Sequence, residues 1–572
     1  MEYTIRIGGQ AGQGLVVVGS SLAKYFSRKG FQVFTHKDYM SRVRGGHNFY
    51  QIRLADHPIS SSRDRVDILI AFDQETIERH RQYLSESGII VYDPEESKKE
   101  FSGPEFVNIP AASIVEEMEV HKVMANSVIM GGVLALLGFN LKIYGEVIGD
   151  IIHKSDEVIE TNTRAAQKGF DHVKENFSDR SAHELPDLEK KDQMLINGNQ
   201  AIGLGALVSG CKFYAAYPMT PSTGIMNYLG SKAKKHRIVI EQAEDEICAI
   251  NMTLGASFGG VRAMTGSSGG GFALMNEGLS LAAMTEIPVV IAEVQRPGPA
   301  TGLPTRTEQG DLSYVLYAGH GEFPRAVFTP GSPEQAFYLT NKAFHLAEKY
   351  QIPVIIQSDQ YLADSEWTFA KFDTDRLLWQ DFRLRDDKLA ETDNYRRHAY
   401  NESGISPLAI PGESKNLVVV DSDEHDEDGH IIEDAETRNK MVRKRLLLKL
   451  PQLQKEIEPP TLYGSENPEN ILVCFGSCLG VVKEAMESLA ADHSLAMLHF
   501  SEVFPFPLTD KFDYVELLKR ARQAICIENN ATGQFARLLR SETSFKCQVN
   551  INKYDGRPFT LESLTGEINE YL

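Results

Sequence analysis

The sequence predicts a multidomain α/β protein, and three observations support that prediction. The chain has 572 residues, far more than one hydrophobic core usually serves. Apolar strand-like runs alternate with helical stretches along most of its length, which is typical of sheets with parallel strands. With 42% hydrophobic and 24% charged residues, the composition is that of an ordinary globular protein. Roughly three or four domains of about 100 to 200 residues each are therefore expected.

The first α/β series is predicted to span residues 1–180. A helix is expected from about Gly14 to Arg28, ended by Gly30, between strands of the parallel βαβ type. The helical segment SVIMGGVLALLGF closes this series, and SDRSAHELPDLEKKDQ is expected to be an exposed linker. The strands expected in this series are YTIRI, FQVFTH, VDILIAF, GIIVYD and FVNIP.

A second α/β series is predicted for residues 193–371. Its expected strands are MLING, KFYAAYP, RIVIEQ, VRAMTG, PVVIAEV and, as the last one, PVIIQSD. Residues 372–460 are polar and irregular and end in a charged helical segment, so they are interpreted as a connecting region. The α/β rhythm returns in residues 461–572, which predicts a small C-terminal domain.

Charge and cysteine usage narrow the class of protein. The net charge of −20 argues against broad binding of phosphates, so no nucleic-acid partner is expected. The longest apolar run is too short to span a bilayer, and the N-terminus lacks a signal-peptide pattern, so no membrane association and a cytoplasmic location are expected. Six scattered cysteines suit a reducing compartment and supply no set of four thiolates for an iron–sulfur cluster.

Two glycine-containing loops of the first series could bind phosphate. The turn GGQAGQG, with Gly12 and Gly14, stands between a strand and a helix, where backbone N–H groups can hold an anion. Its glycine order, GxxGxG, differs from the dinucleotide pattern, and glycines needed only for close packing are an equal alternative. The loop SRVRGGHN places Arg44 beside flexible backbone, which suits a phosphate-bearing ligand or, equally, a solvated loop.

The loop YPMTPSTG of the second series follows a predicted strand. Tyr217 and Pro218 begin it, and Thr220 lies between two prolines that restrict the backbone. Its hydroxyl could serve a carbonyl or carboxylate, which makes Thr220 the catalytic candidate of this loop. Ser222 and Thr223 have the ordinary alternative of capping the next helix.

Two charged residues complete the candidate set. Glu246 is expected in the first turn of a helix, together with Glu244 and Asp245, and precedes a face of small and apolar residues. Its carboxylate is therefore expected in a packed interface, where it needs a partner. Arg306 lies in the loop RPGPATGLPTRTEQGDL and could pair bidentately with the carboxylate of a ligand, with a surface ion pair as the alternative.

Together these motifs resemble the alpha subunit of 2-oxoacid:ferredoxin oxidoreductases in the form with a gamma domain fused at the N-terminus. GGQAGQG and SRVRGGHN resemble the gamma-type α/β domain; YPMTPSTG, EDEICAINMTLGAS, TGSSGGG and GLPTRTEQGDL resemble the thiamine-diphosphate pyrimidine-binding α/β domain; FPFP and IENNATGQFARLL resemble the small C-terminal α/β domain. The match covers essentially the whole chain. It looks most like the 2-oxoglutarate branch, with the pyruvate and branched-chain 2-oxoacid enzymes as alternatives.

The resemblance implies roles for these residues. Glu246 would hydrogen-bond the aminopyrimidine of thiamine diphosphate and favour the tautomer that generates the ylide, and Tyr217 and Pro218 would contact the cofactor. Thr220 and Arg306 would orient the 2-oxoacid for decarboxylation, stepwise oxidation by ferredoxin and transfer of the acyl group to coenzyme A, with the reverse carboxylation also implied. Gly12, Gly14 and Arg44 are the residues expected to bind a cofactor in the first domain.

The resemblance also implies a partner chain. The GDG motif followed about 30 residues later by NN, which holds Mg²⁺ and the diphosphate in thiamine enzymes, is not found. A beta subunit is therefore expected to supply the Mg²⁺–diphosphate site and the [4Fe-4S] cluster, in a dimer of alpha-beta pairs. No metal is assigned to this chain, since the acidic stretch from Asp421 to His430 lacks the pattern of a calcium loop.

Two other classes of function are compatible with parts of the sequence. An NAD-linked dehydrogenase would use the N-terminal glycine loop and would bind nicotinamide in the first domain. A non-catalytic scaffold or electron-transfer adaptor would keep turnover of its complex when Thr220 or Glu246 is replaced.

Overall fold

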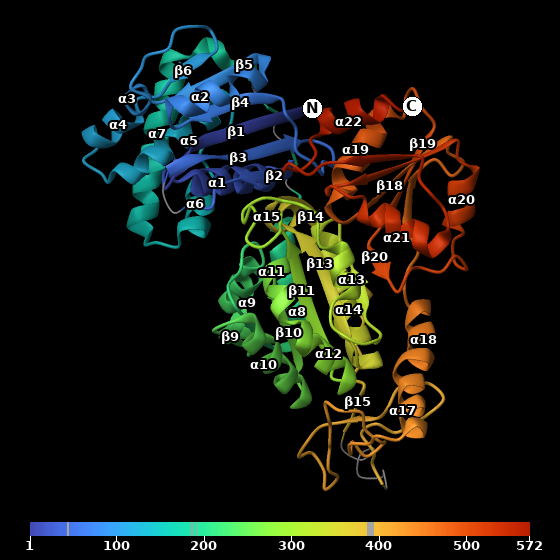
Figure 1. Ribbon diagram of the computed structural model, residues 1–572. Helices are drawn as coiled ribbons and strands as arrows, with labels where there is room; N and C mark the ends of the chain where they lie inside the picture. Colours follow the sequence, from blue (N-terminus) through green and yellow to red (C-terminus); the bar gives the residue numbers. More distant parts are fainter. Residues whose placement is uncertain (43–44, 184, 187, 190, 386–393) are drawn as a thin grey trace. The chain divides into compact units, whose positions relative to one another are not determined.

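The computed structural model describes residues 1–42, 45–183, 185–186, 188–189, 191–385 and 394–572. These residues form two compact units, each with α/β sheets, which confirms the predicted fold class (Figure 1). Unit 1 consists of residues 1–196, 365–371 and 560–562, and unit 2 of residues 197–364, 372–559 and 563–572. The boundaries of the predicted domains stay predictions.

Unit 1 contains an eight-stranded mixed sheet in the order β6-β5-β4-β1-β3-β2-β14-β7. Strands β1, β4, β5 and β6 run parallel, whereas β3 pairs antiparallel with both β1 and β2. The prediction of a parallel sheet here is wrong for β3, because the short link between β2 and β3 cannot form the crossover that parallel neighbours need. Strand β2 runs in the same direction as β1, since both pair antiparallel with β3. The strands are β1 (Glu2–Ala11), β2 (Gln32–Asp38), β3 (Gly45–Ala55), β4 (Val66–Ala71), β5 (Leu84–Tyr92), β6 (Phe106–Asn108), β7 (Gln193–Asn197) and β14 (Glu366–Ala370).

The edge of this sheet is built from distant parts of the chain. Strand β14 pairs antiparallel with β2 through Trp367 and Phe34, and their rings lie 5.1 Å apart. The Tyr50 hydroxyl donates to Glu366 at 2.5 Å. Strand β7, which the sequence assigns to the start of the second series, is the outermost strand of this first sheet.

Helices of unit 1 pack on its sheet through a continuous apolar core. Helix α1 begins after Gly14 and ends at Arg28, as predicted. The helix expected at SVIMGGVLALLGF is also confirmed, as α5. The helices are α1 (Leu15–Arg28), α2 (Gln74–His80), α3 (Pro94–Ser97), α4 (Ala111–Glu117), α5 (Ala125–Leu136), α6 (Tyr144–Ile152) and α7 (Asp156–Asn176).

Unit 2 contains a seven-stranded sheet in the order β20-β12-β13-β11-β10-β8-β9. All its strands run parallel except the edge strand β20. The strands are β8 (Cys211–Ala216), β9 (Val239–Gln242), β10 (Arg262–Ser267), β11 (Val289–Gln295), β12 (Ala326–Phe328), β13 (Pro353–Asp359) and β20 (Glu502–Phe504). The helices between them are α8 (Gly198–Val208), α9 (Thr223–His236), α10 (Glu246–Phe258), α11 (Gly269–Leu274), α12 (Asn276–Met284), α13 (Leu312–Tyr317), α14 (Pro333–Tyr350) and α15 (Gln360–Asp364).

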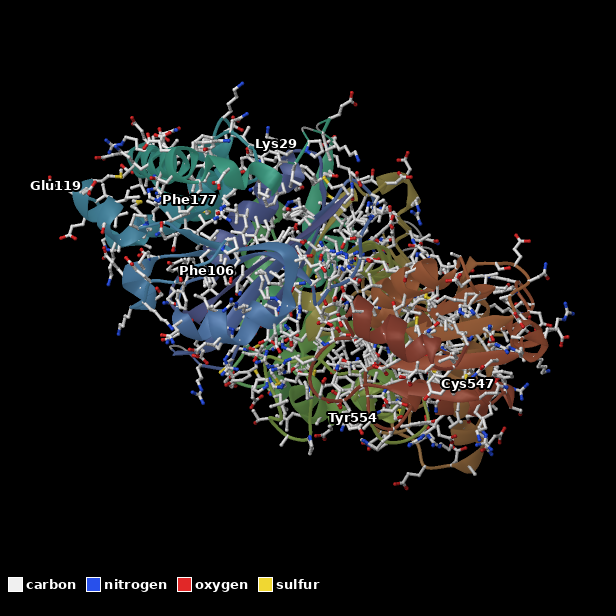
Figure 2. The ribbon with its side chains drawn as sticks, turned by 90° about the horizontal axis from the view of Figure 1, so that it is seen from above. Lys29, Phe106, Glu119, Phe177, Cys547 and Tyr554 are labelled. Carbon is white, nitrogen blue, oxygen red and sulfur yellow. The ribbon has the colours of Figure 1, made fainter. Side chains whose placement is uncertain are left out.

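The C-terminal part of unit 2 forms a second sheet in the order β17-β19-β18-β21-β22. Its side chains join those of the seven-stranded sheet in one apolar core. Cys547, labelled in Figure 2, belongs to this core. All six cysteines are free. The elements are β17 (Thr461–Gly464), β18 (Asn470–Phe475), α19 (Leu479–Leu489), β19 (Leu495–Phe500), α20 (Tyr514–Arg520), β21 (Gln523–Glu528), α21 (Gln534–Thr543), β22 (Val549–Asn552) and α22 (Leu561–Asn569).

The connecting region ends in the expected charged helical segment, formed by α17 (Ala435–Val442), a π-helical turn (Arg443–Leu448) and α18 (Lys449–Lys455) (Figure 1). A small parallel pair, β15 (Arg383–Leu384) and β16 (Leu408–Ala409), precedes it. In the described parts of both units, no helix is long and apolar enough to cross a membrane.

A buried ion network fixes this helical segment to the seven-stranded sheet. Glu286, 1% exposed, accepts hydrogen bonds from Lys444 Nζ at 2.6 Å and from Lys449 Nζ. His398 Nδ1 lies 3.0 Å from its carboxylate, and Arg397 donates to its backbone oxygen at 2.6 Å. Burial alone would raise the pKa of Glu286, but Lys444 and Lys449 hold that pKa well below its ordinary value.

Candidate active site

The carboxyl ends of β8, β10 and β11 bring the candidate residues of unit 2 to one edge of the sheet. Thr220 lies in the loop after β8, Ser267 ends β10, and Arg296 follows β11 directly. Glu246 is the first residue of α10, the helix that follows β9. Ligands of open α/β sheets bind outside the carboxyl ends of the strands, so this edge is the candidate active site.

Glu246 is a buried carboxylate at the start of α10, with 3% of its surface exposed. Asp245 caps this helix by accepting from Cys248 N at 2.7 Å, and Glu244 precedes it, so only Glu246 lies in the first turn. The expectation that Glu246 points away from water is confirmed. Within the described part of the chain its carboxylate accepts one hydrogen bond, from Ser267 Oγ at 3.4 Å.

A glycine gives the carboxylate of Glu246 its space. A Cβ atom at Gly271, in the first turn of α11, would overlap with Glu246 Oε1 and Ser267 Oγ. The TGSSGGG segment therefore lets helix α11 pass close to this carboxylate. One weak hydrogen bond leaves most of the acceptor capacity of Glu246 for a ligand. A donor on an aminopyrimidine ring matches that capacity.

The loop that contains Thr220 is held by hydrogen bonds to its backbone. Arg296 Nη1 donates to the carbonyl oxygen of Thr220 at 2.7 Å. Ser222 stands at the N-cap position of α9, but its hydroxyl donates to Met219 O at 2.7 Å, so the capping alternative is not realised by its side chain. The Thr220 side chain is half-buried, and Tyr217 is 41% exposed.

The arginine that contacts the Thr220 loop is Arg296, a residue not assigned a role from the sequence. Burial lowers the pKa of Arg296. Arg296 could have been recognised from its position directly after the predicted strand β11, because residues at the carboxyl ends of parallel strands face the ligand site. Arg296 is therefore added to the candidate residues.

Arg306 is buried in the same loop, with 9% of its surface exposed, and packs toward the C-terminal part of unit 2. Its backbone N–H donates to Leu303 O at 3.1 Å, and a Cβ at Gly556 would lie 3.3 Å from Arg306 Cβ. A surface ion pair, the alternative for Arg306, does not suit a residue this deeply buried.

Gln309 connects this loop to the C-terminal sheet, which sequence reasoning did not foresee. Its Nε2 donates to Phe475 O at 3.0 Å, and its Oε1 accepts from Asn529 N at 3.0 Å. Its own backbone N–H donates to Asn529 O at 2.6 Å. A single amide side chain has no local pattern that would predict such distant partners.

In unit 1, the predicted phosphate loop has the expected place between β1 and α1. Gly12 and Gly14 adopt positive φ angles of 100° and 87°, where glycine is favoured. A Cβ at Gly14 would overlap with Asn126, so close packing explains this glycine, whereas the space around Gly12 is open. Arg44 lies outside the described residues. In β3, His47 Nε2 lies 2.7 Å from His80 Nε2.

The acidic stretch from Asp421 to His430 forms ion pairs with the helix that follows it. Glu424 contacts Arg438 and Arg445, the latter at 2.7 Å, and Glu427 contacts Lys440 at 3.0 Å. Among the described residues, no group of three or more metal-ligating side chains was found in either unit.

Comparison with known proteins identifies the family of this chain. The family model "Pyruvate flavodoxin/ferredoxin oxidoreductase, thiamine diP-bdg" matches residues 204–444, and the model "Pyruvate ferredoxin/flavodoxin oxidoreductase" matches residues 4–172. The first of these covers Thr220, Glu246, Arg296 and Arg306. The fold and this family model thus define a protein of the thiamine-diphosphate-binding type.

Relatives of full length define the family. A 2-oxoacid:ferredoxin oxidoreductase subunit alpha from a Sulfolobus species is 32% identical over 99% of this chain and 96% of its own. The 2-oxoglutarate oxidoreductase subunit KorA of Mycobacterium tuberculosis is 28% identical over 100% of this chain and 91% of its own. The structure of 2-oxoglutarate:ferredoxin oxidoreductase from Magnetococcus marinus, with 2-oxoglutarate, coenzyme A and succinyl-CoA bound, matches with a TM-score of 0.90, at 31% identity over 100% of this chain and 99% of that one.

This chain belongs to the alpha subunits of the 2-oxoacid:ferredoxin oxidoreductase family. The resemblance deduced from its motifs is thereby confirmed, and its activity is that of an oxidoreductase subunit. An NAD-linked dehydrogenase is not supported by these relatives.

Proposed function

We propose that this chain is the alpha subunit of a 2-oxoglutarate:ferredoxin oxidoreductase, which converts 2-oxoglutarate, coenzyme A and oxidised ferredoxin to succinyl-CoA, CO₂ and reduced ferredoxin. The same subunit would serve the reverse carboxylation. The observation that carries the proposal is the buried carboxylate of Glu246, at the edge where parallel strands end, which accepts a single hydrogen bond, of 3.4 Å, from the residues that the structure describes. The similarity to the Magnetococcus marinus enzyme favours 2-oxoglutarate over other 2-oxoacids.

Each candidate residue has a distinct task in this proposal. Glu246 accepts a hydrogen bond from the aminopyrimidine ring and holds it in a fixed orientation. Thiamine diphosphate, when bound, supplies the electron sink for decarboxylation. Tyr217 and Pro218 border the ring, and Thr220 orients the 2-oxoacid.

The carboxylate of the 2-oxoacid is assigned to Arg296, with Arg306 as the second cation of the same loop. A guanidinium group pairs with a carboxylate through two parallel hydrogen bonds. The hydrogen bond from Arg296 to Thr220 O brings the guanidinium and the threonine together. This pairing supports a shared task in holding the substrate.

A beta subunit completes the site in this proposal. It would hold the diphosphate of the cofactor through Mg²⁺ and would contain the [4Fe-4S] cluster that passes electrons to ferredoxin. The name of the Sulfolobus relative, an alpha subunit, supports a second chain. The assembly is proposed to be a dimer of alpha-beta pairs. Gly12, Gly14 and Arg44 are proposed to bind coenzyme A in the N-terminal domain.

The substrate proposal is tested with the complex of this chain and its beta subunit. Ferredoxin reduction should be fastest, in kcat/KM, with 2-oxoglutarate, compared with pyruvate and branched-chain 2-oxoacids, and should require coenzyme A. The chain without its beta subunit should give no thiamine-dependent turnover. A clear preference for pyruvate would contradict the substrate assignment, and turnover by the isolated chain would contradict the shared site.

Replacing Arg296 and Arg306 one at a time shows which of the two arginines binds the substrate carboxylate. Arg296→Ala is expected to raise KM for the 2-oxoacid by roughly 10- to 100-fold, because loss of a charged hydrogen-bond partner costs about 1.5–3 kcal/mol. Arg296→Lys should raise KM less than Arg296→Ala does, but KM should stay above that of the wild-type enzyme, since lysine cannot pair bidentately. The comparison is Arg306→Ala, measured by steady-state kinetics in the same complex. A larger rise of KM in Arg306→Ala would reassign the carboxylate to Arg306.

A further inference from the structure

A row of polar side chains crosses the seven-stranded sheet near its carboxyl edge. Ser267 of β10, Glu293 of β11 and Gln357 of β13 are register partners on neighbouring parallel strands, so their side chains share one face. Two residues earlier on the same face, Ile291 and Ile355 belong to the apolar core. Glu293 therefore lies at the border between that core and the active site, one strand from Ser267, the donor to Glu246.

The carboxyl group of Glu293 is fully buried, with 0% exposure. Neither oxygen makes a well-formed hydrogen bond with the residues that the structure describes, and the polar side chains that interact with it are those of Gln357 and Asp311. The amide of Gln357 is likewise buried and makes no well-formed hydrogen bond within the same set of residues. An ionised carboxylate in such surroundings is costly to desolvate, which favours the protonated form. Burial first, and then the negative charge of Asp311, raise the pKa of Glu293 well above its ordinary value.

Asp311 brings a second carboxyl group to this edge. Its backbone N–H donates to Gln295 Oε1 at 2.9 Å, and a Cβ at Gly269 would overlap with its carboxyl oxygens. Gly269 therefore gives Asp311 the space that Gly271 gives Glu246. Burial raises the pKa of Asp311, while a side-chain hydrogen bond with Glu293 and the positive charge of Arg296 lower it.

The groups that act on Glu293 come from the segment that starts α13 and from the end of β13. Asp311 and Tyr314 belong to the segment that starts α13, and Asp359 ends β13. Asp359 is 2% exposed and accepts from Leu362 N at 3.0 Å. Arg296, at the end of β11 itself, acts on Asp311. The charges that affect Glu293 most strongly are therefore acidic, and they disfavour its ionisation.

We propose that Glu293, buried beside the active site, stays protonated in the folded chain, so that of these two carboxyl groups only Asp311 carries a negative charge near Arg296. This inference rests on the proposed function where it assigns Arg296 to the substrate carboxylate. With Glu293 neutral, one acid faces Arg296 and the guanidinium can still attract an anionic 2-oxoacid. If Glu293 lost its proton, a second negative charge at the same edge would weaken that attraction.

Infrared spectroscopy of the purified full-length chain tests the protonation state without any turnover. In D₂O near pH 7, the wild-type chain should show the carbonyl band of a protonated carboxylic acid. Glu293→Gln, which replaces the acid by a neutral group of the same shape, should lose this band. Glu322→Gln, the same change at an exposed position, should keep it. A wild-type spectrum that does not differ from that of Glu293→Gln in this band overturns the proposal.

The pH dependence of substrate binding gives the second readout, in the complex with the beta subunit. Glu293 is protonated below its folded-state pKa, so KM of the wild-type enzyme should be low there and should rise roughly ten-fold or more as the pH passes that value. In Glu293→Gln the rise should vanish, with kcat close to that of wild type. Asp311→Asn should move the rise to lower pH, because the charge of Asp311 raises the pKa of Glu293.

The outcomes of the two experiments separate this inference from the proposed function. Loss of kcat in Glu293→Gln would show that a working carboxylate is needed and would overturn the inference. If the complex turns over no 2-oxoacid, the proposed function is contradicted. If, in the same case, the band is present in the wild-type chain and absent from Glu293→Gln, the inference that Glu293 is protonated still holds.

Discussion

Replacing Glu246 by glutamine in the assembled complex is expected to lower kcat by about 10²- to 10⁴-fold, the range that proton-transfer groups contribute to catalysis. Glutamine keeps the size of the side chain and its place beside Ser267, but an amide cannot take a negative charge. Since the carboxylate of Glu246 has only one weak hydrogen bond in the described chain, the substitution should disturb the fold little. The measurement is ferredoxin reduction at saturating 2-oxoacid, with thiamine content determined on the same sample.

Glu244→Gln is the matched control for this experiment. It is the same substitution two residues earlier, at an exposed position before the helix begins. Its kcat should equal that of the wild-type enzyme. If both variants turn over at the wild-type rate, Glu246 has no part in the chemistry and the scaffold alternative regains support.

Replacement of Glu286 is the second change for which we expect a large effect, in this case on stability. Glu286→Gln should destabilise unit 2 by about 3–5 kcal/mol, because Lys444 and Lys449 then lie buried without a counter-charge. The lower stability should be measured as a lower midpoint temperature of thermal unfolding, at a fixed scan rate. Limited proteolysis under native conditions should cut the segment from Arg397 to Lys449 faster, since its anchor to the sheet is lost.

Glu516→Gln controls for the substitution itself. Glu516 pairs with Arg520 on an exposed helix face, and such pairs contribute less than about 0.5 kcal/mol. In a rescue variant, Glu286→Leu combined with Lys444→Met and Lys449→Met should recover much of the loss, because apolar residues of similar volume often replace a buried network without penalty. An unchanged midpoint in Glu286→Gln would show that the network adds no stability.

Local patterns predicted most elements of the fold but not their distant pairing. The helix from Leu15 to Arg28 and the strands of the second series follow from short-range periodicity. That Gln193–Asn197 and Glu366–Ala370 both join the first sheet depends on partners far along the chain. The helical segment from Ala435 to Lys455 was recognised from its charges, but the burial of Lys444 and Lys449 depends on Glu286, more than 150 residues earlier.

For the candidate site, the sequence indicated those residues whose location in the fold can be inferred from the residues next to them in the sequence. Glu246 stands out because it opens a helix with a small, apolar face, and the structure buries it as expected. Arg296 was passed over because the last residue of a strand is hard to define from sequence, and the choice between two arginines in one loop needs three-dimensional contacts. Glu293 is hidden within a strand of valine and isoleucine, where only burial shows that its carboxyl group is unusual.

The late return of β14 to the first sheet bears on how the protein is made. A ribosome releases β2 and β7 long before Glu366–Ala370, the strand that lies between them. Until then the backbone of β2 presents an open edge, a template for pairing with strands of other nascent chains. Trp367 and Glu366 close that edge against Phe34 and Tyr50. Maturation of the N-terminal sheet therefore waits for translation of the entire central sheet.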